Sequence, residues 1–134
     1  MPDRTPRFFS PEDLPKPSGY SQAVRFPAGD LVWTSGQVAV DPEGQVVTVG
    51  SWEDQTRMAM GNVGRALRTA GADWADVVKL TFFVVDMSGL ATVRAVRNEF
   101  IDTRRPPTST LVEVSGLVRP ELLIEIEAFA SVAG

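Results

Sequence analysis

The chain has 134 residues, of which 43% are hydrophobic and 22% charged, and this predicts one globular domain large enough to bury a core. It contains neither histidine nor cysteine, so a Ser-His-Asp triad, a thiolate nucleophile and an ordinary structural zinc site are excluded. The net charge of −4 disfavours nonspecific binding to nucleic acid, which needs a basic surface. We therefore expect any catalysis to use carboxylates, tyrosine, lysine, arginine, hydroxyls, backbone amides or water.

Residues 1–19 are rich in proline and charge, and we expect them to form an extended N-terminal arm without a core of its own. The first residues lack the apolar segment of a signal peptide, and no apolar run reaches the ~20 residues that a membrane helix needs. These features predict a cytoplasmic protein that does not enter a membrane. Residues 20–134 are the predicted domain.

The domain is expected to begin with a hairpin of two paired strands. The first strand is predicted over residues 20–26 and the second over residues 31–40. Gly36 lies inside the second strand, and a glycine at such a position predicts either a bulge or a close approach of another group to the backbone.

A first helix is predicted from Ser51 to Gly71. Ser51 is a natural N-cap, because its hydroxyl can accept a hydrogen bond from a backbone amide in the first turn. Gly71 can adopt the left-handed conformation that ends many helices. The residues at helical spacing that predict the buried face are Thr56, Met60, Val63, Leu67 and Ala70.

A second helix is predicted from about residue 90 to residue 101, and it stops before Pro106. Its apolar stripe consists of Leu90, Val93, Val96 and Phe100. Arg94 and Arg97 lie off that stripe, so we expect them to face away from the core.

Three more strands are predicted over residues 77–85, 106–114 and 122–130. Lys79 interrupts the first, and we interpret it as a lysine whose amine reaches water, with a buried catalytic lysine as the alternative. The order of the elements predicts an α+β domain with both helices on one face of the sheet. The other face then needs a cover, which oligomerisation would provide.

The last strand contains the clearest alternation in the chain, Ile124-Glu125-Ile126-Glu127. Successive side chains of a strand point to opposite faces, so the isoleucines and the glutamates lie on different sides. The acidic face is either hydrated, buried with partners, or a site. We interpret Glu127 as hydrated lining, and both a hydrated and a catalytic role stay open for Glu125.

Several short motifs occur in a fixed order: Gly19-Tyr20-Ser21-Gln22-Ala23, Thr34-Ser35-Gly36-Gln37, Val84-Val85-Asp86-Met87, Val112-Glu113-Val114 and Ile124-Glu125-Ile126-Glu127-Ala128. Together they make the chain similar to the Rid family, also called YjgF and endoribonuclease L-PSP. The resemblance implies a chorismate-mutase-like fold with a mixed sheet, assembled as a homotrimer. It also implies clefts between subunits that bind small carboxylates. We expect neither a cofactor nor a metal.

Family members with the founding activity hydrolyse 2-imino acids to 2-keto acids and ammonia. Tyr20, Ser35 and Glu125 match cleft residues of the family, and the counterpart of Glu125 orients the attacking water. Gly36 would expose a backbone amide to the ligand, and Thr110 is a further candidate for substrate binding.

The chain departs from the family pattern at two positions. Ser109 stands where the family has the arginine that binds the substrate carboxylate, and Arg94 takes the place of an asparagine. A serine offers one donor and no charge, and losing a charge-assisted pair costs on the order of 2–5 kcal/mol. Arg94, Arg104 and Arg105 are the candidates for supplying the missing charge.

Three functions remain open at this point. The first is a hydrolase of C–N bonds in imines or enamines other than the standard 2-imino acids, with Glu125 positioning water. The second is a noncatalytic trimer that binds a small metabolite, and it follows from the arginine lost at Ser109. The third is an endoribonuclease, which the acidic charge and the absence of a histidine base disfavour.

Overall fold

The structure is a computed structural model that describes residues 6–27 and 29–132. Ala28 and residues 1–5 of the predicted arm lie outside the described residues. The elements in chain order are β1 (Arg7–Phe9), β2 (Ala23–Arg25), β3 (Asp30–Trp33), α1 (Trp52–Thr69), a 3₁₀ turn (Trp74–Asp76), β4 (Val77–Val84), a second 3₁₀ turn (Met87–Gly89), α2 (Leu90–Arg97), β5 (Thr108–Glu113) and β6 (Ile124–Val132).

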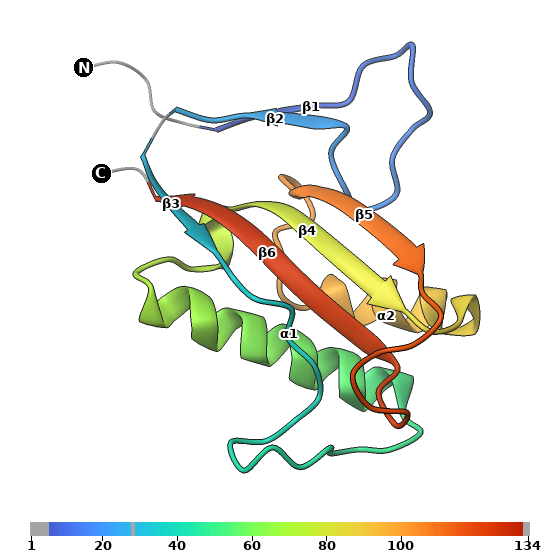
Figure 1. Ribbon diagram of the computed structural model, residues 1–134. Helices are drawn as coiled ribbons and strands as arrows, with labels where there is room; N and C mark the ends of the chain where they lie inside the picture. Colours follow the sequence, from blue (N-terminus) through green and yellow to red (C-terminus); the bar gives the residue numbers. More distant parts are fainter. Residues whose placement is uncertain (1–5, 28, 133–134) are drawn as a thin grey trace.

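Four of the strands form one mixed sheet in the order β3-β6-β4-β5. β4 runs parallel to β5, whereas β6 is antiparallel to both of its neighbours, β3 and β4. Figure 1 shows α1 and α2 on the same side of this sheet. The predicted α+β fold, with a mixed sheet and both helices on one face, is confirmed.

The core lies between the sheet and the two helices. The alternation of β6 sends Ile124 and Ile126 into it, and both are fully buried beside Phe82 of β4. Met60 and Leu67 of α1 cover them from the helix side and are also fully buried. Each such side chain contributes about 1.5–3 kcal/mol through the removal of apolar surface from water.

The local signals at both ends of α1 are confirmed. The Ser51 hydroxyl accepts a hydrogen bond from the amide of Asp54 at 3.0 Å, and Gly71 adopts a φ of +85°. The predicted buried face is confirmed except at Ala70, which is exposed because the helix has ended at Thr69.

The predicted hairpin between residues 20–26 and 31–40 is wrong. β2 pairs with β1, while β3 pairs with the end of β6, which places Val32 opposite Ala130. Pairing with β6 buries Val32 on the core face. A hairpin with β2 would lose the stabilisation that this burial gives. After Trp33 the chain is no longer a regular strand, although Gln37 and Ile126 still exchange two backbone hydrogen bonds.

The other predicted strands are present with ends shifted by up to two residues, whereas α2 is shorter than predicted. It ends at Arg97, and turns carry the chain through Phe100. Arg97 is 6% exposed, so the prediction that it faces away from the core is wrong. It is buried because residues 18–20 of the loop before β2 cover this side of the helix.

Among the described residues, none of the helices combines the length and the apolar character required to cross a membrane.

The sheet face opposite the helices carries no helix in the described part of the chain (Figure 1). Large apolar side chains are exposed there: Trp33 is 70% exposed and Leu31 is 49% exposed. The Trp33 ring packs on Phe129 with 4.4 Å between centroids. We call this surface the open face.

Candidate functional site

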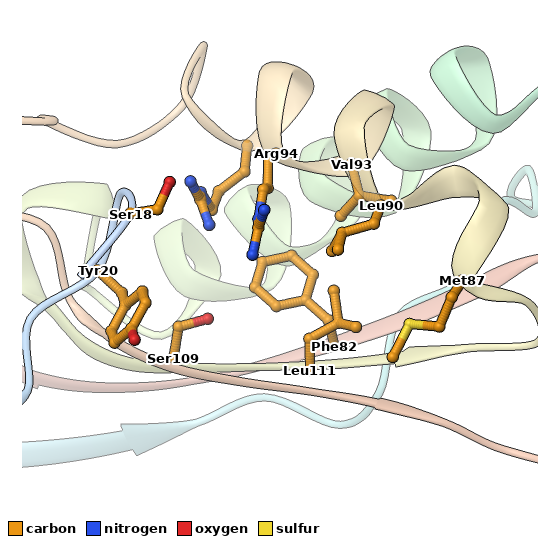
Figure 2. Close-up of a pocket in the computed structure, with 10 residues that line it drawn as sticks. Ser18, Tyr20, Phe82, Met87, Leu90, Val93, Arg94, Ser109 and Leu111 are labelled. Atoms are coloured by element: carbon orange, nitrogen blue, oxygen red, sulfur yellow. The ribbon is translucent and has the colours of Figure 1, made fainter. Parts of the chain in front are cut away.

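A cavity of about 290 Å³ lies between α2, the neighbouring strands β4 and β5, and residues 18–20. Polar side chains line one end, namely Ser18, Tyr20, Arg94, Arg97 and Ser109. Apolar side chains line the rest, namely Phe82, Met87, Leu90, Val93 and Leu111. Figure 2 shows Arg94 extending from the helix toward the strands, with Met87 and Leu90 at the opposite end from Ser18 and Tyr20.

Strand register brings Ser109 into this pocket. In the parallel pair of β4 and β5, Ser109 lies opposite Leu80 and Leu111 lies opposite Phe82. Leu80 and Phe82 are buried against the helices, so Ser109 and Leu111 point to the same side. Thr110 falls on the other side.

The segment before β2 brings in Tyr20. Ser21 forms a parallel bridge with Thr108 at the edge of the sheet, and its amide donates to the Pro107 carbonyl at 3.1 Å. Its hydroxyl donates to the Pro106 carbonyl at 2.7 Å. These bonds hold Tyr20 directly beside the start of β5, where it closes the polar end of the pocket.

Arg94 and Arg97 are three residues apart on α2 and therefore lie on the same side of the helix. The Nε of Arg97 donates to the Asn98 side chain at 3.1 Å. Within residues 6–27 and 29–132, no carboxylate forms an ion pair with either arginine. Burial lowers the pKa of Arg97, and the positive charge of Arg94 lowers it further.

Arg97 lies so close to the backbone at position 19 that a glycine is needed there. Gly19 adopts a φ of +75°, which favours glycine, and a Cβ there would lie 2.0 Å from Nη2 of Arg97. The guanidinium is therefore packed against the backbone of the loop that closes the pocket.

A second group of predicted site residues lies on the open face. Glu125 pairs with Phe83, one position away from the buried Ile126, and so points away from the helices. A Cβ on Gly36 would lie 2.6 Å from Cδ of Glu125, which confirms the predicted close approach to the Gly36 backbone. The adjacent Ser35 accepts a hydrogen bond at its carbonyl from the Gln37 side chain at 3.2 Å.

The remaining candidates lie elsewhere. Thr110 is on the open face, where its hydroxyl accepts a hydrogen bond from Nζ of Lys79, and burial lowers the pKa of that lysine. Arg104 pairs with Asp102 at 3.1 Å, and Arg105 stacks on the ring of Phe8 in β1. Neither arginine lines the pocket.

The structure therefore brings Tyr20, Arg94 and Ser109 together in one pocket. It places Glu125 against Gly36 on the opposite face of the sheet, and Ser35 precedes Gly36 in the chain. Sequence reasoning missed Ser18 and Arg97 as pocket residues. The spacing of Arg97 from Arg94 was the available signal, because residues three apart share one side of a helix.

Comparison with known proteins gives a consistent result. The family model described as Endoribonuclease L-PSP matches residues 12–132. A RutC family protein of Pyrococcus horikoshii is 38% identical over 120 residues, which cover 89% of this chain and 92% of that protein. The Escherichia coli protein named putative reactive intermediate deaminase TdcF is 34% identical over 104 residues, 76% of this chain and 79% of TdcF.

Solved structures agree with the sequence relatives. The Rid family protein YyfB of Yersinia pestis, described as of unknown function, superposes with a TM-score of 0.84 at 36% identity, over 95% of this chain and 98% of YyfB. Escherichia coli TdcF with bound serine superposes with a TM-score of 0.69 at 30% identity, over 95% of this chain and 99% of TdcF. The fold is thus that of the YjgF-like proteins. The chain belongs to the Endoribonuclease L-PSP family, which is also the Rid or YjgF family.

Proposed function

We propose that this protein is a cytoplasmic hydrolase that cleaves the C–N bond of a small imine or enamine. The observation that carries the proposal is the position of Glu125, whose side chain is held against Gly36 on the face of the sheet opposite α1 and α2. A relative named as a putative reactive intermediate deaminase supports the same chemistry.

The proposed reaction is the hydrolysis of a C=N bond. Glu125 orients a water molecule and accepts its proton as the water oxygen attacks the imine carbon. The same proton is then delivered to the nitrogen. The resulting carbinolamine loses ammonia and leaves a carbonyl compound. An enamine first takes a proton on carbon to become the imine, so each turnover consumes one water and releases one ammonia.

Within a single chain, the two groups of site residues lie on opposite faces of one sheet. In the assembled protein, a group from one subunit would meet the other group from its neighbour. A homotrimer that buries the open face would cover Leu31 and Trp33, which stand 49% and 70% exposed in the single chain. It would also bring Glu125 of one copy toward Tyr20 and Ser109 of the next. The active cleft would then be shared between subunits.

Ser109 sets the expected substrate preference. It supplies a hydroxyl where a carboxylate-binding guanidinium would hold a 2-imino acid, so standard 2-imino acids are expected to be poor substrates. Tyr20 and Ser109 would instead orient the ligand by hydrogen bonds from their hydroxyl groups.

The test measures ammonia release from a panel of imines and enamines that includes enzymatically generated 2-aminoacrylate. The Glu125→Gln variant is expected to lose about 10²–10⁴-fold in turnover of any substrate found, as is typical for the removal of a general base. Ser109→Arg is expected to gain activity on 2-aminoacrylate. Undiminished turnover by Glu125→Gln would refute the proposed mechanism.

A noncatalytic metabolite-binding trimer is the second candidate, and the lack of arginine at Ser109 favours it. This function predicts that ligands raise the unfolding temperature while the whole panel gives no ammonia with the wild type or with Ser109→Arg. An endoribonuclease is the least supported function, because the chain has no histidine and a net charge of −4.

A further inference from the structure

We propose that Arg94 and Arg97 bind a dianionic head group, either a phosphate monoester or a dicarboxylate, at the polar end of the pocket. The inference deepens the proposed function and rests on it for the assignment of this pocket as the substrate site. It adds the charge and the shape of the ligand.

The first observation is the burial of an arginine without a counter-ion. Arg97 is 6% exposed, and no carboxylate within ion-pair distance appears among the described residues. Buried charges in proteins are paired or otherwise compensated, because removing them from water is costly. Since Arg97 lines the pocket, a bound anion is the compensation that this position lacks.

The second observation is the neighbouring charge. Arg94 lines the same pocket one helical turn earlier, and the two positive charges repel each other. A monoanion would neutralise one guanidinium and leave the other uncompensated. A dianion would neutralise both, and guanidinium groups suit carboxylate and phosphate oxygens because they donate two parallel hydrogen bonds.

The donors that remain free define how the head group would bind. The Nε of Arg97 is engaged by Asn98, so its two Nη groups are the donors left for an anion. The hydroxyls of Ser18, Tyr20 and Ser109 line the same end and can donate to further oxygens of the head group.

The part of the pocket beyond the arginines limits the size and the polarity of the rest of the ligand. Beyond the arginines the lining is apolar, with Met87 and Leu90 at the far end (Figure 2), and the whole cavity holds about 290 Å³. The ligand is therefore small, with a dianionic head and a short apolar body. The short side chain of Ser109 leaves room for the head group beside Arg94 and Arg97.

The experiment is a calorimetric titration in low-chloride, phosphate-free buffer with four probes: phenyl phosphate, succinate, inorganic phosphate and the monoanion butyrate. Wild type is expected to bind a dianion at least about tenfold more tightly than butyrate, because each charge-assisted hydrogen bond contributes roughly that factor. A comparison of the affinities for phenyl phosphate and succinate shows whether a phosphate or a dicarboxylate is preferred. Equal binding of butyrate and the dianions, or no binding of any dianion, would overturn the proposal.

Variants separate a binding role from a structural one. Arg97→Gln and Arg94→Gln are each expected to weaken dianion binding by about 10–100-fold. Arg104→Gln, whose arginine is solvent-exposed and outside the pocket, is the matched control and should bind like wild type. Dianion binding that survives in Arg97→Gln would contradict the assignment.

Thermal unfolding without anion supplies a second readout. Arg97→Met removes a buried uncompensated charge and keeps the volume, so its unfolding temperature is expected to equal or exceed that of wild type while the dianion-induced increase disappears. A large decrease in unfolding temperature would instead show that Arg97 holds the fold together, and would overturn the binding role.

Failure of the anion site can be told apart from failure of the hydrolase, because the titration measures dianion binding without any turnover. Dianion binding without ammonia release from any imine would retain the anion site and reject the hydrolase. Turnover of an uncharged imine without dianion binding would retain the hydrolase and reject the anion site.

Discussion

The two faces of the four-stranded sheet differ in what covers them and in the charges they carry. The helix side holds the core and the pocket, and the part of the chain that the structure describes gives Arg94 and Arg97 of this pocket no acidic partner. The open face carries Glu125 and Glu127 of β6 and the exposed side chains of Leu31 and Trp33 of β3. A step of one residue along a strand decides between these environments, because side chains alternate in direction.

This contrast separates the candidate site residues into two groups. Ser109 and Thr110 are neighbours in sequence, yet Ser109 lines the pocket and Thr110 contacts Lys79 on the open face. In the proposed trimer the two half-sites meet between copies. The following predictions test the contrast in order of decreasing effect.

The largest effect is expected from truncating Phe82, which is 1% exposed on the helix side. Phe82→Ala should lower the free energy of unfolding by about 3–5 kcal/mol, because it removes a large buried side chain and leaves a cavity. Phe83→Ala on the open face is the matched control and should cost the single chain clearly less. Urea denaturation measures both variants, and equal losses would mean that the open face is packed as firmly as the core.

The second effect concerns association through the open face. Trp33→Glu places a charge where an exposed tryptophan is proposed to be buried between copies, and it should weaken association by at least about 2 kcal/mol per contact. Light scattering coupled to gel filtration measures the assembly. A variant that keeps the mass of the wild-type assembly would show that this part of the open face is not an interface.

The third effect concerns the loop that packs on Arg97. Gly19→Ala should cost about 1–2 kcal/mol for the left-handed conformation, and it should also displace the guanidinium and weaken dianion binding. Gly50→Ala is the matched control, because Gly50 has a φ of +82° and a Cβ there meets nothing within 4 Å. If both variants bind dianions like wild type, the contact between Gly19 and Arg97 does not shape the site.

The smallest effect is expected at the ion pair between Arg57 of α1 and Glu99, which follows α2. The hydrogen bond from Arg57 lowers the pKa of Glu99 below its usual value of 4.5 in the folded state. The ion pair therefore contributes a small stabilisation of the folded state at pH values above 4.5. This stabilisation is lost as the pH falls through the lowered pKa of Glu99. Glu99→Gln should show a slightly weaker loss of stability on acidification than wild type, measured by thermal unfolding between neutral and acidic pH.

The sequence by itself determined the features that depend on neighbouring residues. The Ser51 cap, the Gly71 end, and the alternation of isoleucine and glutamate in β6 are local, since they follow from backbone geometry within a few residues. These patterns, with the element order, were sufficient to predict an α+β fold with both helices on one face. The motif order was sufficient to predict the family, which the comparisons confirm.

Tertiary structure decided which segments meet. The pairing of β3 with β6 rather than β2 depended on the burial that a distant strand offers, which no local pattern encodes. Arg97 was likewise predicted to face away from the core because its spacing alone says nothing of residues 18–20, which close over it. The division of the site residues between two faces follows from strand register, and register is set by long-range pairing between β4, β5 and β6.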